Sequence, residues 1–247
     1  DRFVEVASAL IDGLETGVLE YDGKYIRQIP SPIRPLPLRS FRGRTYASAV
    51  SPESMHIMAD LGGGILIIPQ KPWDDMVADI QKYNAIFEKS RGRPAPPPLS
   101  AGWVFCDEDP VRARELAQKY IGEYYQTVLD HYDFGQHMKS TKGYEYYGKF
   151  HDTLKNQGEQ KMIDFFVDLH VWGTPQQCID KIADLHAKVG NAAFLGVFSY
   201  ASMPTDEAER NMRLFAEKVM PTVRNISKNA EIDTSSQEHL RGRLVPA

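Results

Sequence analysis

The segment Ser51–Pro52–Glu53–Ser54 carries the residue types that point most directly to binding chemistry in this chain. It follows a short apolar run and precedes a stretch with helical periodicity, so Ser51 is expected to cap a helix whose first residue is Pro52. The first turn of a helix leaves backbone N–H groups unpaired and carries partial positive charge, which favours a bound anion. The amides of Glu53, Ser54 and Met55 would then be free to bind an anion.

The same segment can also be explained without a ligand. Ser51 would only cap its helix, and the carboxylate of Glu53 in the first turn would complement the helix dipole. Glu53 would also have to point away from a bound dianion, because like charges repel. On the residues alone, capping is the simpler interpretation.

A second group of chemically capable side chains lies in residues 130–170. This stretch is rich in tyrosine, histidine and glycine, and it shows no dominant period before a helical pattern that begins near residue 160. A histidine or a tyrosine can donate or accept a proton in catalysis. The candidates are His131, His137, Tyr144 and Tyr147. Taken one at a time, each of them fits surface packing or a solvated loop better than a catalytic role.

Several classes of function find no support in the sequence. No His/Glu spacing indicates a metal site, and no serine stands in the Gly-x-Ser-x-Gly turn of a hydrolase. A formal net charge of −4 and the lack of a long basic cluster argue against nucleic acid as a partner. The two cysteines, Cys106 and Cys178, match no metal or redox spacing and are expected to act as small buried hydrophobes.

The sequence predicts a protein of the cytoplasm. Its longest apolar runs, over residues 62–69 and 192–198, are far too short to cross a bilayer. No charged-then-apolar signal segment opens the chain, and the scarcity of cysteine fits a reducing compartment.

Short apolar runs alternate with amphipathic stretches along the chain. Runs without polar alternation are typical of strands that are buried on both faces, and they cover residues 44–50, 63–69, 99–106 and 192–200. Helical periodicity or helix caps mark residues 2–17, 52–61, 73–90, 107–129, 173–190 and 206–220. Asp-Gly within residues 18–29 predicts a hairpin. The alternation predicts a parallel α/β architecture, either an open sheet or a (β/α) barrel.

Three glycines, Gly62–Gly64, stand between a predicted helix and a predicted strand. A phosphate-binding loop has its glycines in the opposite place, after a strand and before a helix. These glycines are therefore expected to form a tight turn.

Two parts of the sequence resemble the bacterial luciferase-like monooxygenase family. Residues 173–224 resemble its closing segment, in which Gly-Thr-Pro opens the last barrel helix and the final helix ends in Arg-x-Phe-Ala-x-x-Val-Met-Pro, here Arg213 to Pro221. The helix at residues 2–14, the hairpin, the Pro-rich connector and residues 47–54 follow in the order that family members use. The resemblance covers about residues 1–125 and 170–224.

The resemblance implies a (β/α)8 TIM barrel, of which this chain would hold the C-terminal half, strands five to eight. Residues 1–225 would belong to one barrel domain with a lid insertion at residues 130–170, and residues 226–247 would form a polar, disordered tail. Because the first four strand–helix units have no counterpart, the chain is expected to be a fragment of a longer protein.

The resemblance also assigns roles to the candidate residues. In that family the turn after the fifth strand holds the flavin phosphate, which favours a phosphate site at residues 51–54 over simple capping. Ile68, at the carboxyl end of the next strand, would line the flavin pocket. The four candidates in the lid would line the substrate pocket or donate a proton to a flavin peroxide.

The function implied by the resemblance is that of a flavin-dependent monooxygenase, which oxidises a small hydrophobic organic substrate with O2 and reduced FMN. A separate flavin reductase would supply the reduced flavin, and the protein would be a bacterial homo-oligomer. Two alternatives stay open: a deazaflavin-dependent oxidoreductase of the same fold, and a non-catalytic flavin-binding protein.

Overall fold

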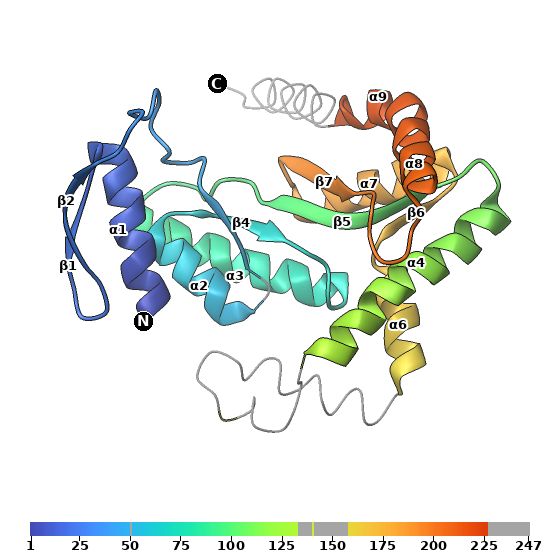
Figure 1. Ribbon diagram of the computed structural model, residues 1–247, viewed down its shortest axis with the longest axis horizontal. Helices are drawn as coiled ribbons and strands as arrows, with labels where there is room; N and C mark the ends of the chain where they lie inside the picture. Colours follow the sequence, from blue (N-terminus) through green and yellow to red (C-terminus); the bar gives the residue numbers. More distant parts are fainter. Residues whose placement is uncertain (50, 133–139, 141–157, 227–247) are drawn as a thin grey trace, which may run out of the picture. The chain divides into compact units, whose positions relative to one another are not determined.

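The structure, a computed structural model, describes residues 1–49, 51–132, 140 and 158–226 (Figure 1). The chain divides into two compact units. Unit 1 holds residues 1–68 and 73–99, and unit 2 holds residues 69–72 and 100–247. That residues 1–225 form one barrel domain stays a prediction. The tail expected at residues 226–247 lies outside the described residues, except for the half-buried Ile226.

Unit 1 combines a helix and hairpin with two parallel strands and their helices. Its elements are α1 (Arg2–Thr16), β1 (Val18–Asp22), β2 (Arg27–Pro32), β3 (Tyr46–Ser48), α2 (Pro52–Leu61), β4 (Gly64–Ile67) and α3 (Trp73–Arg91). β1 and β2 form the expected antiparallel hairpin, and β3 runs parallel to β4 with Ser48 opposite Leu66. The α2 bounds agree with the expected helix at residues 52–61.

Glu5 of α1 holds the turn of the hairpin, which lies along this helix (Figure 1). Its carboxylate accepts the backbone N–H groups of Lys24 at 3.2 Å, Tyr25 at 2.7 Å and Ile26 at 2.8 Å. Partial desolvation raises the pKa of Glu5, but the three amides together outweigh it and hold the pKa below its ordinary value. One ionised side chain therefore fixes the position of the hairpin turn.

Replacing Glu5 with alanine is expected to loosen this turn, because three amides lose their acceptor. Amide hydrogen exchange at residues 24–26 should become faster, while exchange within β3 and β4 stays unchanged. Glu20→Ala is the matched control, since Glu20 is an exposed carboxylate in the same hairpin. Unchanged exchange at residues 24–26 in the Glu5 variant would contradict the anchoring role.

The turn between α2 and β4 is built on glycine, as expected. Gly62 ends α2 with a φ of 75°, in the left-handed region that favours glycine. A Cβ at Gly64 would lie 2.4 Å from Cε1 of Tyr46 in the neighbouring strand. The Tyr83 hydroxyl donates to the carbonyl oxygen of Gly63 at 2.8 Å. The glycines thus allow a close approach of helix and strand, and they form no phosphate loop.

Unit 2 contains most of β5 and the elements that follow it. They are β5 (Leu99–Cys106), α4 (Pro110–His131), α6 (Glu159–Asp168), β6 (Val171–Gly173), α7 (Pro175–Val189), β7 (Ala193–Val197), α8 (Thr205–Lys218) and α9 (Met220–Val223). β5 runs parallel to β6, with Cys106 opposite Gly173, and β7 also pairs with β5. α4 and α6 lie side by side in Figure 1.

Local sequence signals set the helix starts in unit 2. Asp109 caps α4 by accepting the N–H of Val111 at 2.8 Å, and Pro110 follows as the first helical residue. Thr174 and Gln177 form the expected capping box at the start of α7. Both helices were expected from these caps.

Two strands of unit 2 differ from expectation. The sequence does not predict β6, because its residues stand between the helical pattern of α6 and the cap of α7 and form no separate apolar run. It predicts β7 as buried on both faces, but Leu195 and Val197 are 43% and 38% exposed, so one face of this strand is open. Among the described residues, no helix combines the length and apolar character needed to cross a membrane.

Candidate functional site

The turn from β3 into α2 places two serine hydroxyls against each other. Ser51 is the N-cap of α2, and its Oγ accepts the backbone N–H of Ser54 at 3.2 Å. The two hydroxyl oxygens lie 2.5 Å apart, and Ser54 Oγ also donates to the carbonyl oxygen of Ser51 at 3.0 Å. Ser51 is buried, with 6% of its surface exposed, and Ser54 is half-buried. The hydroxyl pair is therefore held in a defined place at the start of the helix.

The first turn of α2 has fewer free amides than the sequence indicates. The N–H of Met55 donates to the carbonyl oxygen of Ser51 at 3.2 Å, and the N–H of Ser54 donates to Ser51 Oγ. The expectation that the amides of residues 53–55 are all free is therefore wrong. The N-cap serine satisfies one amide with its side chain and another with its carbonyl group. Within the described residues, only the Glu53 amide of this turn has no partner.

The other three residues predicted for this site, Pro52, Glu53 and Ile68, also lie in unit 1, and Pro52 is the first residue of α2. The side chain of Glu53 is exposed. Ile68 is half-buried and directly follows β4. The N–H of Ala49 donates to the carbonyl oxygen of Leu66 at 3.2 Å, so the chain leaves β3 and β4 at matching positions. Ser51 and Ile68 therefore both lie at the carboxyl edge of this strand pair.

The structure describes one of the four lid candidates. His131 is the last residue of α4 and is exposed, with Nδ1 2.7 Å from the carbonyl oxygen of Thr127. This contact within one helix turn fits surface packing. His137, Tyr144 and Tyr147 lie outside the described residues, so the roles expected for all four stay predictions.

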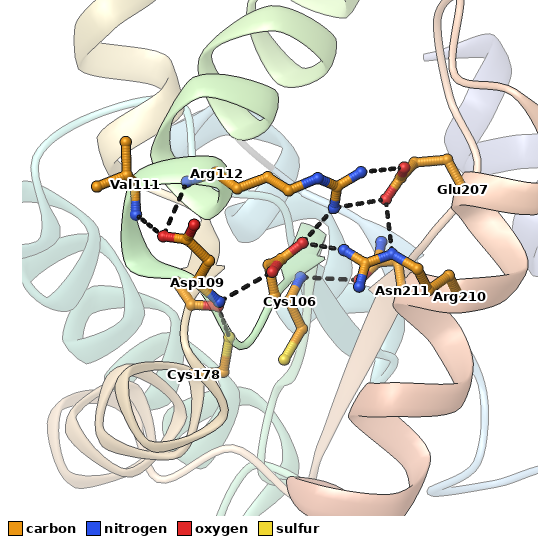
Figure 2. A network of polar contacts seen from close by, with 10 residues as sticks. Cys106, Asp109, Val111, Arg112, Cys178, Glu207, Arg210 and Asn211 are labelled. Atoms are coloured by element: carbon orange, nitrogen blue, oxygen red, sulfur yellow. Dashed lines mark hydrogen bonds and ion pairs between the residues drawn. The ribbon is translucent and has the colours of Figure 1, made fainter.

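The carboxyl end of β5 carries a charged cluster that the sequence does not reveal (Figure 2). Asp107, which is 3% exposed, accepts bonds from Arg112 of α4 and Arg210 of α8. Glu207 of α8 binds the same two arginines, at 2.5 Å from Arg112 Nη2 and 3.3 Å from Arg210 Nε. The backbone N–H of Asp109 donates to Asp107 Oδ1 at 2.9 Å. Two carboxylates and two guanidinium groups thus neutralise each other and cross-link β5, α4 and α8.

His170, directly before β6, is a second buried titratable group that the sequence does not single out. It is 2% exposed, and neither ring nitrogen has a hydrogen-bond partner among the described residues. The rings of Trp103 and Phe166 meet it edge-on, with centroids at 4.7 and 4.4 Å. Burial, helped by the charge of Lys181, lowers the pKa of His170 to about 3. The imidazole is therefore neutral at pH 7.

Comparisons with known proteins bear on the family and the fold. The family model described as luciferase-like monooxygenase matches residues 1–191. The alkanal monooxygenase alpha chain of Photorhabdus luminescens is 23% identical over 214 residues, which cover 85% of this chain. The match covers 59% of that relative, so this chain spans less than two thirds of its length.

Solved structures share the fold at low sequence identity. The coenzyme F420-dependent tetrahydromethanopterin reductase of Methanopyrus kandleri is 20% identical with a TM-score of 0.55, covering 89% of this chain and 62% of that chain. A second structure is the oxygenating constituent of 3,6-diketocamphane monooxygenase from Pseudomonas putida, solved in complex with FMN. It is 16% identical with a TM-score of 0.53, and the match covers 86% of this chain and 60% of that chain. The expected fold class, part of a luciferase-like TIM barrel, is confirmed. Because the family model matches residues 1–191, which are most of the sequence, the chain belongs to the luciferase-like monooxygenase family.

Proposed function

We propose that this chain is part of a flavin-dependent monooxygenase and that it binds the phosphate of reduced FMN at the start of α2. The observation that carries the proposal is the hydroxyl pair of Ser51 and Ser54 at the carboxyl edge of β3 and β4. Barrels of alternating strands and helices place their active sites at this edge. The FMN complex of a structure with the same fold supports the choice of cofactor.

The residues of this turn fit a phosphate group. The Ser51 hydroxyl can donate its proton to a phosphate oxygen while its oxygen still accepts the Ser54 amide, because a hydroxyl donates and accepts at once. The Ser54 hydroxyl can turn in the same way, and the Glu53 amide offers a third donor. The partial positive charge at the start of α2 adds to these bonds.

Bound reduced flavin would supply the chemistry with O2, and the chain would position the cofactor and exclude water. Ile68 is proposed to line the flavin pocket. His131, His137, Tyr144 and Tyr147 are proposed to belong to a lid over a small hydrophobic organic substrate. We further propose that a separate flavin reductase supplies the reduced flavin. The protein is proposed to be a homo-oligomer in the bacterial cytoplasm. The relatives named as alkanal and diketocamphane monooxygenases support the substrate class.

A deazaflavin-dependent oxidoreductase is the second candidate function. The reductase of Methanopyrus kandleri, whose fold this chain shares, depends on coenzyme F420. Titration of the chain with FMN and with F420, followed by fluorescence, separates the two candidates. Tighter binding of F420 than of FMN would favour the second.

Replacing Ser51 and Ser54 together with alanine is expected to weaken FMN binding by roughly tenfold or more, since hydrogen bonds to charged groups contribute about 1.5–3 kcal/mol each. Riboflavin, which lacks the phosphate, should bind both proteins equally. Fluorescence titration measures both affinities.

Ser48→Ala is the matched control for this experiment, because Ser48 is an exposed serine of β3. The double variant should also lose about 1 kcal/mol of unfolding free energy with its cap. A loss of stability with unchanged FMN affinity would reduce the motif to a helix cap and contradict the phosphate site.

A further inference from the structure

An open cleft of unit 2 lies between α4 and α7 and has Trp172 of β6 in its wall. Its volume is about 610 Å³, within the roughly 300–1,000 Å³ of typical small-ligand sites. Pro110 and Val111 of α4 give it apolar surface, and Val111 is 63% exposed. Its charged lining residues are Arg114, Glu115, Asp180 and Lys181. The cleft therefore combines an apolar surface open to water with charges of both signs.

Two cations gather around the indole ring of Trp172. The Nζ atom of Lys181 lies 3.9 Å from the ring centroid, and the Cζ atom of Arg114 lies 5.9 Å from it. The ring itself is held in place, because its Nε1–H donates to the carbonyl oxygen of Val167 at 2.9 Å. Contact with a neutral ring positions the two cations but leaves their charge unchanged. The wall of the cleft at Trp172 is therefore positively charged.

Neither cation forms an ion pair within the part of the chain that the structure describes. Lys181 is half-buried, and its Nζ donates to the carbonyl oxygen of His170 at 3.4 Å. Burial lowers the pKa of Lys181, and the charge of Asp168 offsets this effect only in part. Arg114 is exposed and makes no hydrogen bond to a described residue. A negatively charged ligand would supply the partner that both side chains lack.

The two carboxylates in the lining, Glu115 and Asp180, limit the charge that such a ligand can carry. Both residues are exposed, and Asp180 Oδ1 accepts a hydrogen bond from Gln176 Nε2 at 2.8 Å. Because the two cations and the two carboxylates balance, a compact dianion such as phosphate would be repelled about as strongly as it is attracted. A ligand with one negative charge and an apolar body fits this lining better.

We propose that the cleft binds an organic monocarboxylate, with its carboxylate beside Lys181 and Arg114 and its apolar body along Pro110 and Val111. A carboxylate accepts charge-assisted hydrogen bonds from ammonium and guanidinium groups. Hydrocarbon that covers Val111 removes apolar surface from water. Binding is non-covalent and does not rest on the proposed function, because the predicted phosphate-binding turn lies in unit 1.

The test uses octanoate as the probe and octanamide as its uncharged counterpart, with flavin-free protein. The chain has three tryptophans, so labelling with 5-fluorotryptophan gives three fluorine NMR signals, and Trp172→Phe identifies the signal of Trp172. Octanoate should shift this signal to saturation, because a carboxylate beside Lys181 and Arg114 changes the electric field at the ring. Octanamide should leave it in place. Added NaCl should weaken octanoate binding, since ions screen the attraction.

Variants of the two cations test the assigned contacts. Lys181→Met should weaken octanoate binding roughly tenfold or more, because it removes a half-buried charge. Arg114→Gln should weaken it roughly threefold, and it changes an exposed side chain, so the fold is retained. Lys119→Met is the matched control, since Lys119 is an exposed lysine of α4 that lies 5.0 Å from the ring of Tyr120 and outside the cleft. Its affinity should equal that of wild type.

Three results would overturn the proposal. The first is an equal shift of the Trp172 signal with octanoate and octanamide, and the second is a shift that does not saturate. The third is unchanged octanoate affinity in both the Lys181 and the Arg114 variants. Displacement of octanoate by phosphate at constant ionic strength would overturn the assignment to monocarboxylates. Loss of FMN binding on replacement of the serines in unit 1 leaves all of these measurements unaffected.

Discussion

Replacing Asp107 with asparagine is expected to lower the free energy of unfolding by about 2 kcal/mol. The carboxylate is almost fully buried and binds Arg112 and Arg210, while asparagine keeps the shape but removes the charge. Removing one partner of a buried ion pair typically costs about 3–5 kcal/mol, but these arginine side chains are 38% and 43% exposed, so water compensates part of the loss. Urea unfolding at pH 7 measures the difference.

A surface ion pair on α8 provides the matched control. Arg213 lies 2.7 Å from Glu209, and these side chains are 71% and 58% exposed. Glu209→Gln should therefore change the unfolding free energy by less than about 0.5 kcal/mol. Similar losses in the two variants would show that the cluster at Asp107 contributes no more than an ordinary surface pair.

Local signals explain why the sequence predicts most helices of this chain. The side chain of Asp109 and the box of Thr174 and Gln177 act within one turn, so their effect can be read from a few neighbouring residues. β6 has only three residues, and its pairing with β5 decides its conformation. These residues directly follow the helical pattern of α6, so no separate apolar run marks them in the sequence.

Contacts between distant residues explain what the sequence does not reveal at the sites. Asp107 and Arg210 are 103 positions apart, and nothing in either local pattern links them. Arg114 and Lys181 meet at Trp172 through the pairing of β5 with β6, which no local pattern reveals either. Ser51, in contrast, was predictable as a cap. Its side chain bonds the Ser54 amide and contacts the Ser54 hydroxyl, and these contacts depend on the geometry of one turn.

Stability below neutral pH is expected to depend strongly on His170. Its pKa is about 3 in the folded protein and 6.5 without the protein environment. Between these values the unfolded chain binds more protons than the folded one, so the folded state loses stability as pH falls. Above pH 6.5 the neutral His170 costs the folded state nothing. Below it the free energy of unfolding should fall by about 1.4 kcal/mol per pH unit, which gives a loss of about 2 kcal/mol at pH 5. Urea unfolding at pH 7.5 and pH 5 measures this change.

Substituting phenylalanine for His170 separates this effect from the titration of carboxylates. The variant keeps an aromatic ring beside Trp103 and Phe166 but has no group that binds a proton, so its loss between pH 7.5 and 5 should be about 2 kcal/mol smaller than in wild type. A difference between two pH values cancels any constant change that the larger ring causes in packing. His131→Gln, at an exposed histidine, should leave the pH dependence close to that of wild type. If the phenylalanine variant loses as much stability as wild type, His170 must be able to take up a proton in the folded state, and the aromatic core around it must admit water.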